Sequence, residues 1–344
     1  MINKKDFLKL NTINSKIAVE RLTALWALNE CALGGLMHAF KLPLTGIIVG
    51  GTSVLLISLI ALYATNMRST LLKALTIVLL VKAGVSPYSP ITAYFAVSFQ
   101  AFLAILLYSV FSINKLSIVA LSAITLLESA LQKLVTLTVL FGQSLWKAVD
   151  VYSGWVGKQL SFLPFALNSK TLIYTFLGAY AFSGIVIGFI IIRTIKLIQR
   201  VNVSQIDIEL NTKLPEINSK KTNKKSIYIF LVLLVVVLIP ILYYSDETQA
   251  WQKAVYLIVR SVLILIVWYT LLGPFLIKLI NKLYLKKRKL YQTDLQSILN
   301  IFPSLKAIIV YSWKDCSSYR GLNRLSQFLA KSIAYSLYFN NTKE

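Results

Sequence analysis

The chain has few of the residues that build metal centres and disulfide frameworks. It contains a single histidine and two cysteines in 344 residues. One histidine cannot supply a multi-histidine metal centre. Cys31 and Cys316 are too few and too far apart in sequence to indicate a disulfide framework or a metal site. We therefore predict no bound metal.

The sequence motifs of common catalytic machinery are missing as well. There is no GxxxxGK[ST] phosphate-binding loop, so the chain does not hydrolyse ATP by that route. There is no HExxH, no GxSxG and no aspartate-rich cluster of the kind that holds magnesium. We expect no enzyme and no cofactor. The catalytic alternative left open is a membrane-embedded enzyme that uses Glu30 or Glu128 as its base.

Charged residues are scarce, whereas apolar residues are abundant and clustered. Hydrophobic residues make up 57% of the chain and charged residues 14%. The apolar residues form runs of about twenty, the length at which a helix crosses ~30 Å of hydrocarbon. The formal net charge is +23, yet the basic residues flank the apolar runs and do not form one stripe mixed with aromatics. The sequence predicts an integral membrane protein whose partner is the lipid bilayer and not nucleic acid.

The apolar runs predict an all-α, polytopic membrane bundle of eight spanning helices. The predicted spans are 22–41, 45–64, 69–84, 91–111, 117–141, 171–192, 227–244 and 254–277. A lysine-rich segment separates six helices from two. The predicted parts are a basic tail (1–21), a six-helix bundle (22–195), a linker (196–226), a two-helix module (227–277) and a basic amphipathic tail (278–344). The positive-inside rule then places both termini inside, in a multi-pass protein of the plasma or inner membrane.

The three connections that this topology places outside have unusual sequences. They read HAFKLPLTG (38–46), KAGVSPYSPITAY (82–94) and FGQSLWKAVDVYSGWVGKQL (141–160). They concentrate proline, glycine, aromatic residues and lysine, whereas the inside connections are short and plain. This asymmetry predicts an outward-facing site. Residues 144–160 are expected to form an amphipathic helix on the outer surface or, alternatively, a lid.

Ionisable residues within the predicted helices lie beneath these connections. Glu30, His38 and Lys41 fall on one face of the first helix, and Glu128 has a similar depth on the fifth. A charge near the bilayer centre costs about 2.5 to 3.5 kcal/mol, so we expect the glutamates to face a wet cavity or lysines of neighbouring helices. Those lysines are Lys73, Lys82 and Lys133.

Three interpretations of these groups stay open. Glu30 or Glu128 pairs with Lys82 or Lys133 and holds the helices in register. Alternatively, the groups line a cavity whose basic rim suits an anionic or carboxylate-bearing solute. The third interpretation is a proton relay through Glu30 and His38. The candidate substrate-binding residues are Glu30, His38, Lys41, Lys82, Tyr88, Thr92, Glu128, Gln132 and Lys133.

Two further surfaces are suited to contacts with partners. A small residue at every fourth position of the first helix allows another helix to approach closely. These residues are Ala27, Cys31, Gly35 and Ala39. The C-terminal tail carries aromatic and basic residues at loosely helical spacing, which predicts a helix on the anionic inner leaflet or one that docks on a cytoplasmic partner. These residues are Trp313, Tyr319, Arg320 and Arg324.

The small-residue stripe, together with GGLMHAFKLPLTG and KAGVSPYSPITAY, resembles the substrate-capture (S) component of energy-coupling factor vitamin transporters. The resemblance covers roughly residues 20–195. It implies that the stripe packs against a membrane coupling (T) subunit, which two cytoplasmic ATPases drive. Residues 227–344 depart from the family, because a standard S component lacks them. Within this part, SSYRGLNR is only faintly similar to the Ala-Arg-Gly coupling motif of T subunits.

The sequence therefore predicts a transporter subunit that captures a small, anionic solute, such as a vitamin or its precursor, from outside. Separate coupling and ATPase subunits would supply the energy. The alternative is a non-transporting membrane scaffold. In that case the polar helix residues hold the bundle together and the basic tail recruits a cytoplasmic partner.

Overall fold

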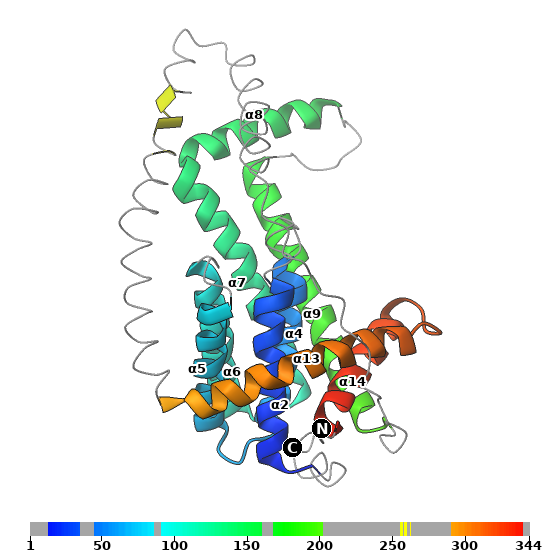
Figure 1. Cartoon of the computed structure of the whole chain (residues 1–344). Helices are drawn as coiled ribbons and strands as arrows, with labels where there is room; N and C mark the ends of the chain where they lie inside the picture. The colour runs from blue at the N-terminus through cyan, green and yellow to red at the C-terminus, as the bar shows by residue number, and fades with distance from the viewer. Residues whose placement is uncertain are drawn as a thin grey trace. The chain divides into compact units, whose positions relative to one another are not determined.

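The computed structural model describes residues 13–34, 45–85, 91–159, 168–201 and 290–339, and a few positions between 255 and 262. These residues are almost entirely helical (Figure 1). The helices are α2 (Ser15–Leu28), the π-helix η1 (Asn29–Leu33), α4 (Thr45–Tyr63), α5 (Met67–Val85), α6 (Ile91–Phe111), α7 (Lys115–Phe141), α8 (Gln143–Gln159), α9 (Ser169–Ile198), α13 (Gln292–Asp315) and α14 (Gly321–Tyr338). Two compact units result. The first comprises Met1–Leu131, Leu177–Thr212 and Leu279–Glu344, and the second comprises Gln132–Phe176 and Lys213–Lys278.

Helices α4, α5, α6, α7 and α9 confirm the second to sixth predicted helices to within a few residues at most ends. Asparagine side chains help to fix where four helices begin, because each accepts a backbone N–H of the first turn. The pairs are Asn14 with Lys16, Asn66 with Ser69, Asn114 with Ser117, and Asn168 with Thr171. The first helix accordingly begins at Ser15 and not at residue 22, and Ala18 is already fully buried in its first turn.

Five helices of the described part of the chain are long and apolar enough to cross a membrane. They are Gly46–Tyr63, Thr92–Phe111, Lys115–Phe141, Ser169–Ile198 and Gln292–Asp315. Four of them correspond to predicted spans, whereas sequence analysis assigns the last, α13, to the basic tail. The predicted spans 227–244 and 254–277 lie outside the described residues, apart from a few positions. The count of eight spans and the side on which the termini lie therefore stay predictions.

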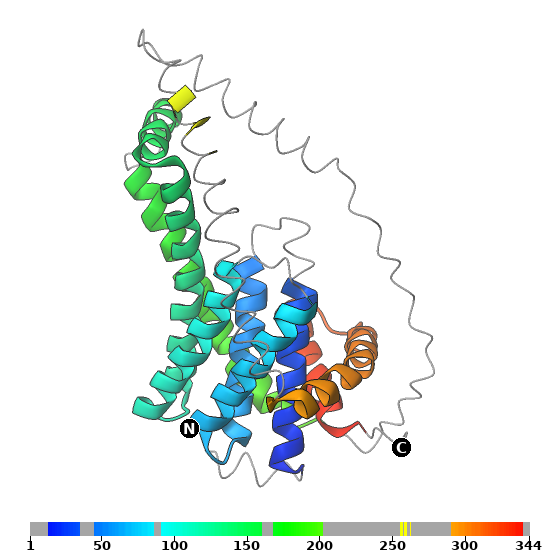
Figure 2. The same cartoon turned by 60° about the vertical axis from the view of Figure 1, so that its left-hand side comes forward.

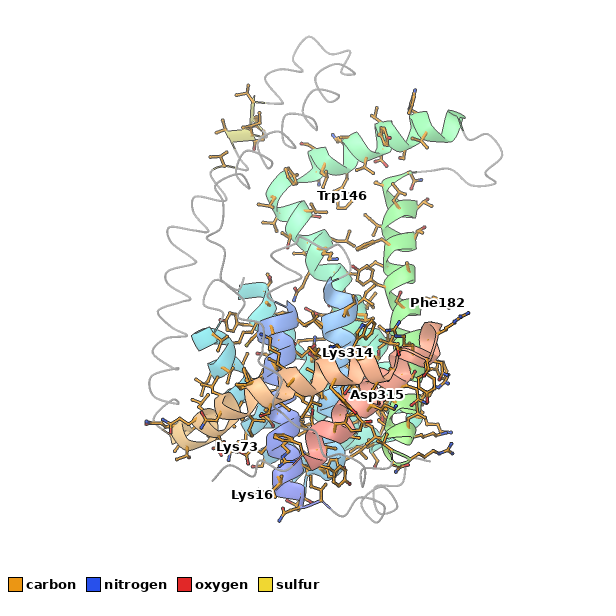
Figure 3. All side chains as sticks on the ribbon, turned by 45° about the vertical axis from the view of Figure 1, so that its right-hand side comes forward. Lys16, Lys73, Trp146, Phe182, Lys314 and Asp315 are labelled. Atoms are coloured by element: carbon orange, nitrogen blue, oxygen red, sulfur yellow. The ribbon has the colours of Figure 1, made fainter. Side chains whose placement is uncertain are left out.

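The first unit has a central helix, α4, surrounded by helices with exposed apolar faces. Most side chains of α4 between residues 53 and 63 are buried, as expected for a helix that is apolar on all sides. By contrast, Phe102 on α6 and Phe182 and Phe189 on α9 are each more than half exposed. Figure 3 labels Phe182 on α9. Contiguous apolar surface of this kind is suited to contact with lipid.

Glycines bring α4 and α9 close to α7. A Cβ atom at Gly46 of α4 would lie 2.9 Å from the Cβ of Ser129. On α9, a Cβ at Gly184 would lie 2.5 Å from the Cα of Ala123, and one at Gly188 would lie 2.8 Å from the Cα of Val119. These distances leave no room for a side chain. The spacing Gly-x-x-x-Gly thus fixes the α9–α7 contact through the backbone itself.

Helices α13 and α14 belong to the first unit and pack against α2, with α13 running across α2 and not along it (Figures 1 and 2). Apolar residues of both helices, including Ile298, Ile308 and Ile333, join the hydrophobic core. Polar contacts fix the same arrangement. Lys73 of α5 pairs with Asp294 of α13 at 3.0 Å. The Arg21 guanidinium of α2 donates to the carbonyl oxygen of Leu337 at 2.6 Å and lies 4.5 Å from the Phe339 ring centroid.

The second unit contains α8, which matches the amphipathic helix expected at 144–160. Gly142 makes the turn from α7 into α8 with a φ of 67°, a left-handed conformation that glycine adopts without strain. Its N–H donates to the carbonyl oxygen of Thr138 at 2.8 Å. The Trp146 indole N–H then donates to the Thr138 hydroxyl at 3.1 Å, which fixes the bend. Tyr152 and Trp155 are more than half exposed, as expected for a helix at an interface.

The same unit contains a carboxylate whose contribution to stability depends on pH. Asp150 of α8 accepts the backbone N–H of Ser169, at the start of α9, at 2.6 Å. The backbone and side-chain hydrogen bonds from Ser169, with a smaller effect of the Lys170 charge, hold the pKa of Asp150 below its ordinary value of 3.8. Because the folded pKa is depressed, the stabilisation is present above the ordinary pKa and is lost as the pH falls through the folded pKa.

We expect Asp150→Ala to lower the melting temperature (Tm) of the purified protein at neutral pH. The difference from the wild-type protein should disappear in strongly acidic solution, where the carboxylate is protonated in both states. Asp150→Asn keeps an acceptor oxygen without the charge, so its Tm at neutral pH should lie between the two. Equal Tm values for the alanine variant and the wild-type protein at neutral pH would contradict this role.

Candidate functional site

The first helical segment changes its helical geometry at the acidic residue that the sequence singles out. Residues Asn29–Leu33 form a π-helical turn, and the N–H of Gly34 donates to the carbonyl oxygen of Asn29, five residues earlier. Single π-turns within α-helices are rare and occur frequently at functional sites. Glu30 and Cys31 lie in this turn and are both buried. The π-turn therefore presents an acidic side chain to the interior of the bundle.

Glu30 forms a buried ion pair with Lys82. The Lys82 ammonium of α5 lies 2.7 Å from Oε2 of Glu30, and the two side chains are 3% and 5% exposed. The Ser53 hydroxyl of α4 donates to the other carboxylate oxygen, Oε1, at 2.6 Å. Both carboxylate oxygens therefore have a donor. The structure thus contains the Glu30–Lys82 pair that the first interpretation predicted, whereas the role of the pair stays open.

Asn29 extends this pair into a polar network on three segments. Its amide nitrogen donates to the Ser53 hydroxyl at 2.9 Å and to the carbonyl oxygen of Val49 at 3.2 Å. The Thr52 hydroxyl in turn donates to the amide oxygen of Asn29 at 2.7 Å. A continuous chain of hydrogen bonds thus runs from Thr52 through Asn29, Ser53 and Glu30 to Lys82. Networks of this kind are strong when every member has a partner.

Only some of the other predicted site residues lie in the described part of the chain. Thr92 is exposed on α6, and Glu128 is buried at 8% exposure on α7. Gln132 and Lys133 belong to the second unit. His38, Lys41, Tyr88, Gly35 and Ala39 lie outside the described residues. The described half of the small-residue stripe, Ala27 and Cys31, is buried in the core of this chain.

Lys73 does not meet the glutamates. The sequence predicts that it faces the membrane glutamates or a wet cavity, and it lines a cavity at the start of α5. In the structure it pairs with Asp294, and the two side chains are 49% and 37% exposed (Figure 3). Lys73 lies nearly two turns after the start of α5, where α13 crosses, so its ammonium reaches a carboxylate that is distant in sequence. Lys82, more than two turns further along α5, is the lysine that meets Glu30.

Sequence analysis missed Asn29, Thr52 and Ser53. A weak signal for the last two was present, because TS interrupts an otherwise apolar run in α4. For Asn29 the signal was its position directly before Glu30. Small polar residues are common in membrane helices, so they indicate a site only when a charged partner is known to lie beside them.

A cavity of about 410 Å³ lies at the other end of α2, between the start of α2, the α4–α5 turn, α5 and the start of α13. Its polar lining includes Lys16, Glu20, Thr23, Ser69, Lys73 and Asp294. Charges of both signs line it, so it has no clear preference for an anion. No group of three or more His, Cys, Asp or Glu side chains within the described residues could hold a metal ion.

Over the described residues, the fold and the site define a class, an all-helical protein with five helices long and apolar enough to cross a membrane and with a buried ion-pair network between its first helices. No protein-family model matches the chain, and no curated protein and no solved structure shows significant similarity to it.

Proposed function

We propose that the chain is a membrane transporter subunit that captures a small, anionic solute from outside, energised by separate coupling and ATPase subunits. The observation that carries the proposal is the buried Lys82–Glu30 pair at a π-helical turn. Lys82 lies one turn before the end of α5, and η1 ends shortly before residue 35. The segments that follow, 35–44 and 86–90, belong to the connections that the predicted topology places outside.

The pair provides a means to bind a carboxylate. A buried ammonium is costly unless a negative group accompanies it. A solute carboxylate that replaces Glu30 at the Lys82 ammonium keeps that charge compensated, so the cost of burying the lysine does not arise again. Ser53 and Asn29 supply donors to a displaced Glu30 or to the solute. The Tyr94 ring centroid, 6.0 Å from Nζ of Lys82, supplies an aromatic face beside the same ammonium.

A thermal-shift screen of the purified protein tests this function. Carboxylate-bearing vitamins and their precursors should include a compound that stabilises the protein, by about 2.7 kcal/mol at 100 times its dissociation constant. The neutral amide of the same compound should not stabilise it. The stabilisation should be absent in the Glu30→Gln/Lys82→Met double variant, which removes both charges together. It should persist in Lys73→Met, which removes a lysine of the same helix outside the network.

The screen has two outcomes that contradict the proposal. One is that no compound stabilises the protein. The other is that the stabilising compound acts equally on the double variant, which would place its site elsewhere.

A membrane scaffold is the second candidate, and the C-terminal helices favour it. Helices α13 and α14 are held on the bundle by Lys73 and Arg21 and present exposed aromatic and basic side chains. In this case the Lys82–Glu30 pair only holds α2 against α5. The scaffold therefore predicts that no solute stabilises the protein, although loss of Lys82 still destabilises it.

A further inference from the structure

The surface at the α13–α14 turn combines exposed apolar side chains with basic ones. The apolar members are Val310, Tyr311, Trp313, Leu322 and Leu325, and the basic members are Lys314, Arg320 and Arg324. We propose that this turn surface binds the anionic headgroups of the phospholipid bilayer in which the chain lies. The proposal goes beyond solute capture and requires only that the protein is in a membrane.

An arginine–tryptophan stack lies at the centre of the turn surface. The Arg324 guanidinium carbon is 4.3 Å from the Trp313 ring centroid, and the Phe328 ring meets Trp313 edge-on at 5.1 Å. Trp313 is 49% exposed. Its indole ring thus contacts an apolar ring of the protein and has a cation beside it. This combination is typical of side chains at the boundary between hydrocarbon and headgroups.

The cations of the turn surface are available to a ligand. Within the described residues, none of the three cations Lys314, Arg320 and Arg324 forms a salt bridge. The neighbouring carboxylate, Asp315, is already bound by the Lys331 ammonium at 2.7 Å and by the Tyr335 hydroxyl at 3.0 Å (Figure 3). The net charge that the surface presents is therefore positive.

The end of α9 indicates where the turn surface lies along the membrane normal. Arg193 of α9 donates to the side-chain oxygen of Asn323 at 2.8 Å, at the start of α14. Lys196 near the end of α9 and Arg200, two residues after its end, are exposed. A candidate span that ends in a cluster of basic residues passes from hydrocarbon into the headgroup region at that cluster. The hydrogen bond to Asn323 places the start of α14 beside this boundary.

The chemistry of the turn surface favours lipid over a protein partner. Protein interfaces are enriched in tryptophan, tyrosine and arginine but depleted of lysine, and the centre of the interface carries few charges. Here the cations alternate with the apolar side chains, and Arg324 lies directly on the central tryptophan. Alternating basic and apolar residues on one helical surface are the pattern of segments that lie in the interface of an anionic membrane.

Quenching of Trp313 fluorescence by brominated lipids tests the proposal with the full chain in nanodiscs. The signal of Trp313 is the difference between the wild-type protein and Trp313→Phe. Brominated phosphatidylglycerol should quench this signal more strongly than brominated phosphatidylcholine does. In Arg320→Gln, the fraction of phosphatidylglycerol that gives half-maximal quenching should rise about fivefold, the effect expected for one cation near the surface. Lys147→Gln, an exposed lysine on α8, should leave it unchanged.

Two results overturn the proposal. Equal quenching by both brominated lipids would mean that the surface contacts membrane without recognising anionic headgroups. No quenching of Trp313 by either lipid would mean that the turn surface does not face a membrane, and would point to a protein partner instead.

Discussion

Replacing Lys82 with methionine is expected to lower the free energy of unfolding by about 3 to 5 kcal/mol. Methionine fills a similar volume, so the loss comes from the charge and not from a cavity. The variant leaves the Glu30 carboxylate at 5% side-chain exposure without its cation, and only the Ser53 hydroxyl remains as a described donor. Unfolding of the protein in mixed micelles by titration with sodium dodecyl sulfate measures the change.

Two further variants show whether the loss belongs to the ion pair. The double variant Glu30→Gln/Lys82→Met removes both charges and keeps a polar group beside Ser53, so most of the stability should return. Lys73→Met offers a matched control on the same helix. Lys73 also pairs with a carboxylate, but at the exposed surface, where such a pair contributes about 0 to 1 kcal/mol. A double variant as unstable as Lys82→Met, or a Lys73 variant with an equal loss, would contradict the ion-pair explanation.

The sequence was sufficient to predict the helices and one of their charged contacts. Apolar runs of suitable length defined α4, α5, α6, α7 and α9, because a membrane helix must bury its backbone hydrogen bonds and expose apolar side chains. The cost of a charge in the bilayer predicted that Glu30 faces either a lysine or a wet cavity. The sequence could not show whether Lys82 or Lys133 meets Glu30, because the answer depends on which helices are neighbours.

The rest of the site depends on features without a distinct sequence pattern. The π-turn at Asn29–Leu33 lies within NECALGG, a stretch whose composition is ordinary for a membrane helix. The hydrogen bonds from Asn29 to Ser53 and from Thr52 to Asn29 require α2 and α4 to meet in one register. Likewise, the composition of the C-terminal tail predicted a basic surface helix. That α13 would cross α2 and α5 follows from long-range contacts such as Lys73–Asp294.

Small-residue spacing was only a partial guide to helix packing. The described residues of the stripe from Ala27 to Ala39 are buried within the chain, and contact of the stripe with a partner subunit stays a prediction. Two other small-residue patterns occur, GIIVG at 46–50 and GIVIG at 184–188. Both glycines of the second make close contacts with α7, whereas in the first only Gly46 does, because a Cβ at Gly50 would meet its neighbours at an ordinary 3.4 Å or more. Both patterns have the spacing Gly-x-x-x-Gly, which brings two backbones together when a partner helix fits. The spacing alone does not say which of three such patterns has that partner.

Gly184→Ala should destabilise the protein by about 1 to 3 kcal/mol, whereas Gly178→Ala should leave it unchanged or stabilise it by up to about 1 kcal/mol. Both substitutions add one methyl group to α9, and alanine favours a helix over glycine at either position. The difference lies in what the methyl group meets. At Gly184 it would lie 2.5 Å from the Cα of Ala123, a backbone atom that cannot move without its helix, and at Gly178 nothing lies within 4 Å.

The same unfolding titration measures both glycine variants, and their difference removes the common gain in helix propensity. Gly184→Leu should be worse than Gly184→Ala, because a larger side chain forces α9 further from α7. If the two alanine variants have equal stability, α9 does not depend on close backbone contact with α7. The contact would then be held by the apolar side chains around it, and the Gly-x-x-x-Gly spacing in α9 would have no structural role.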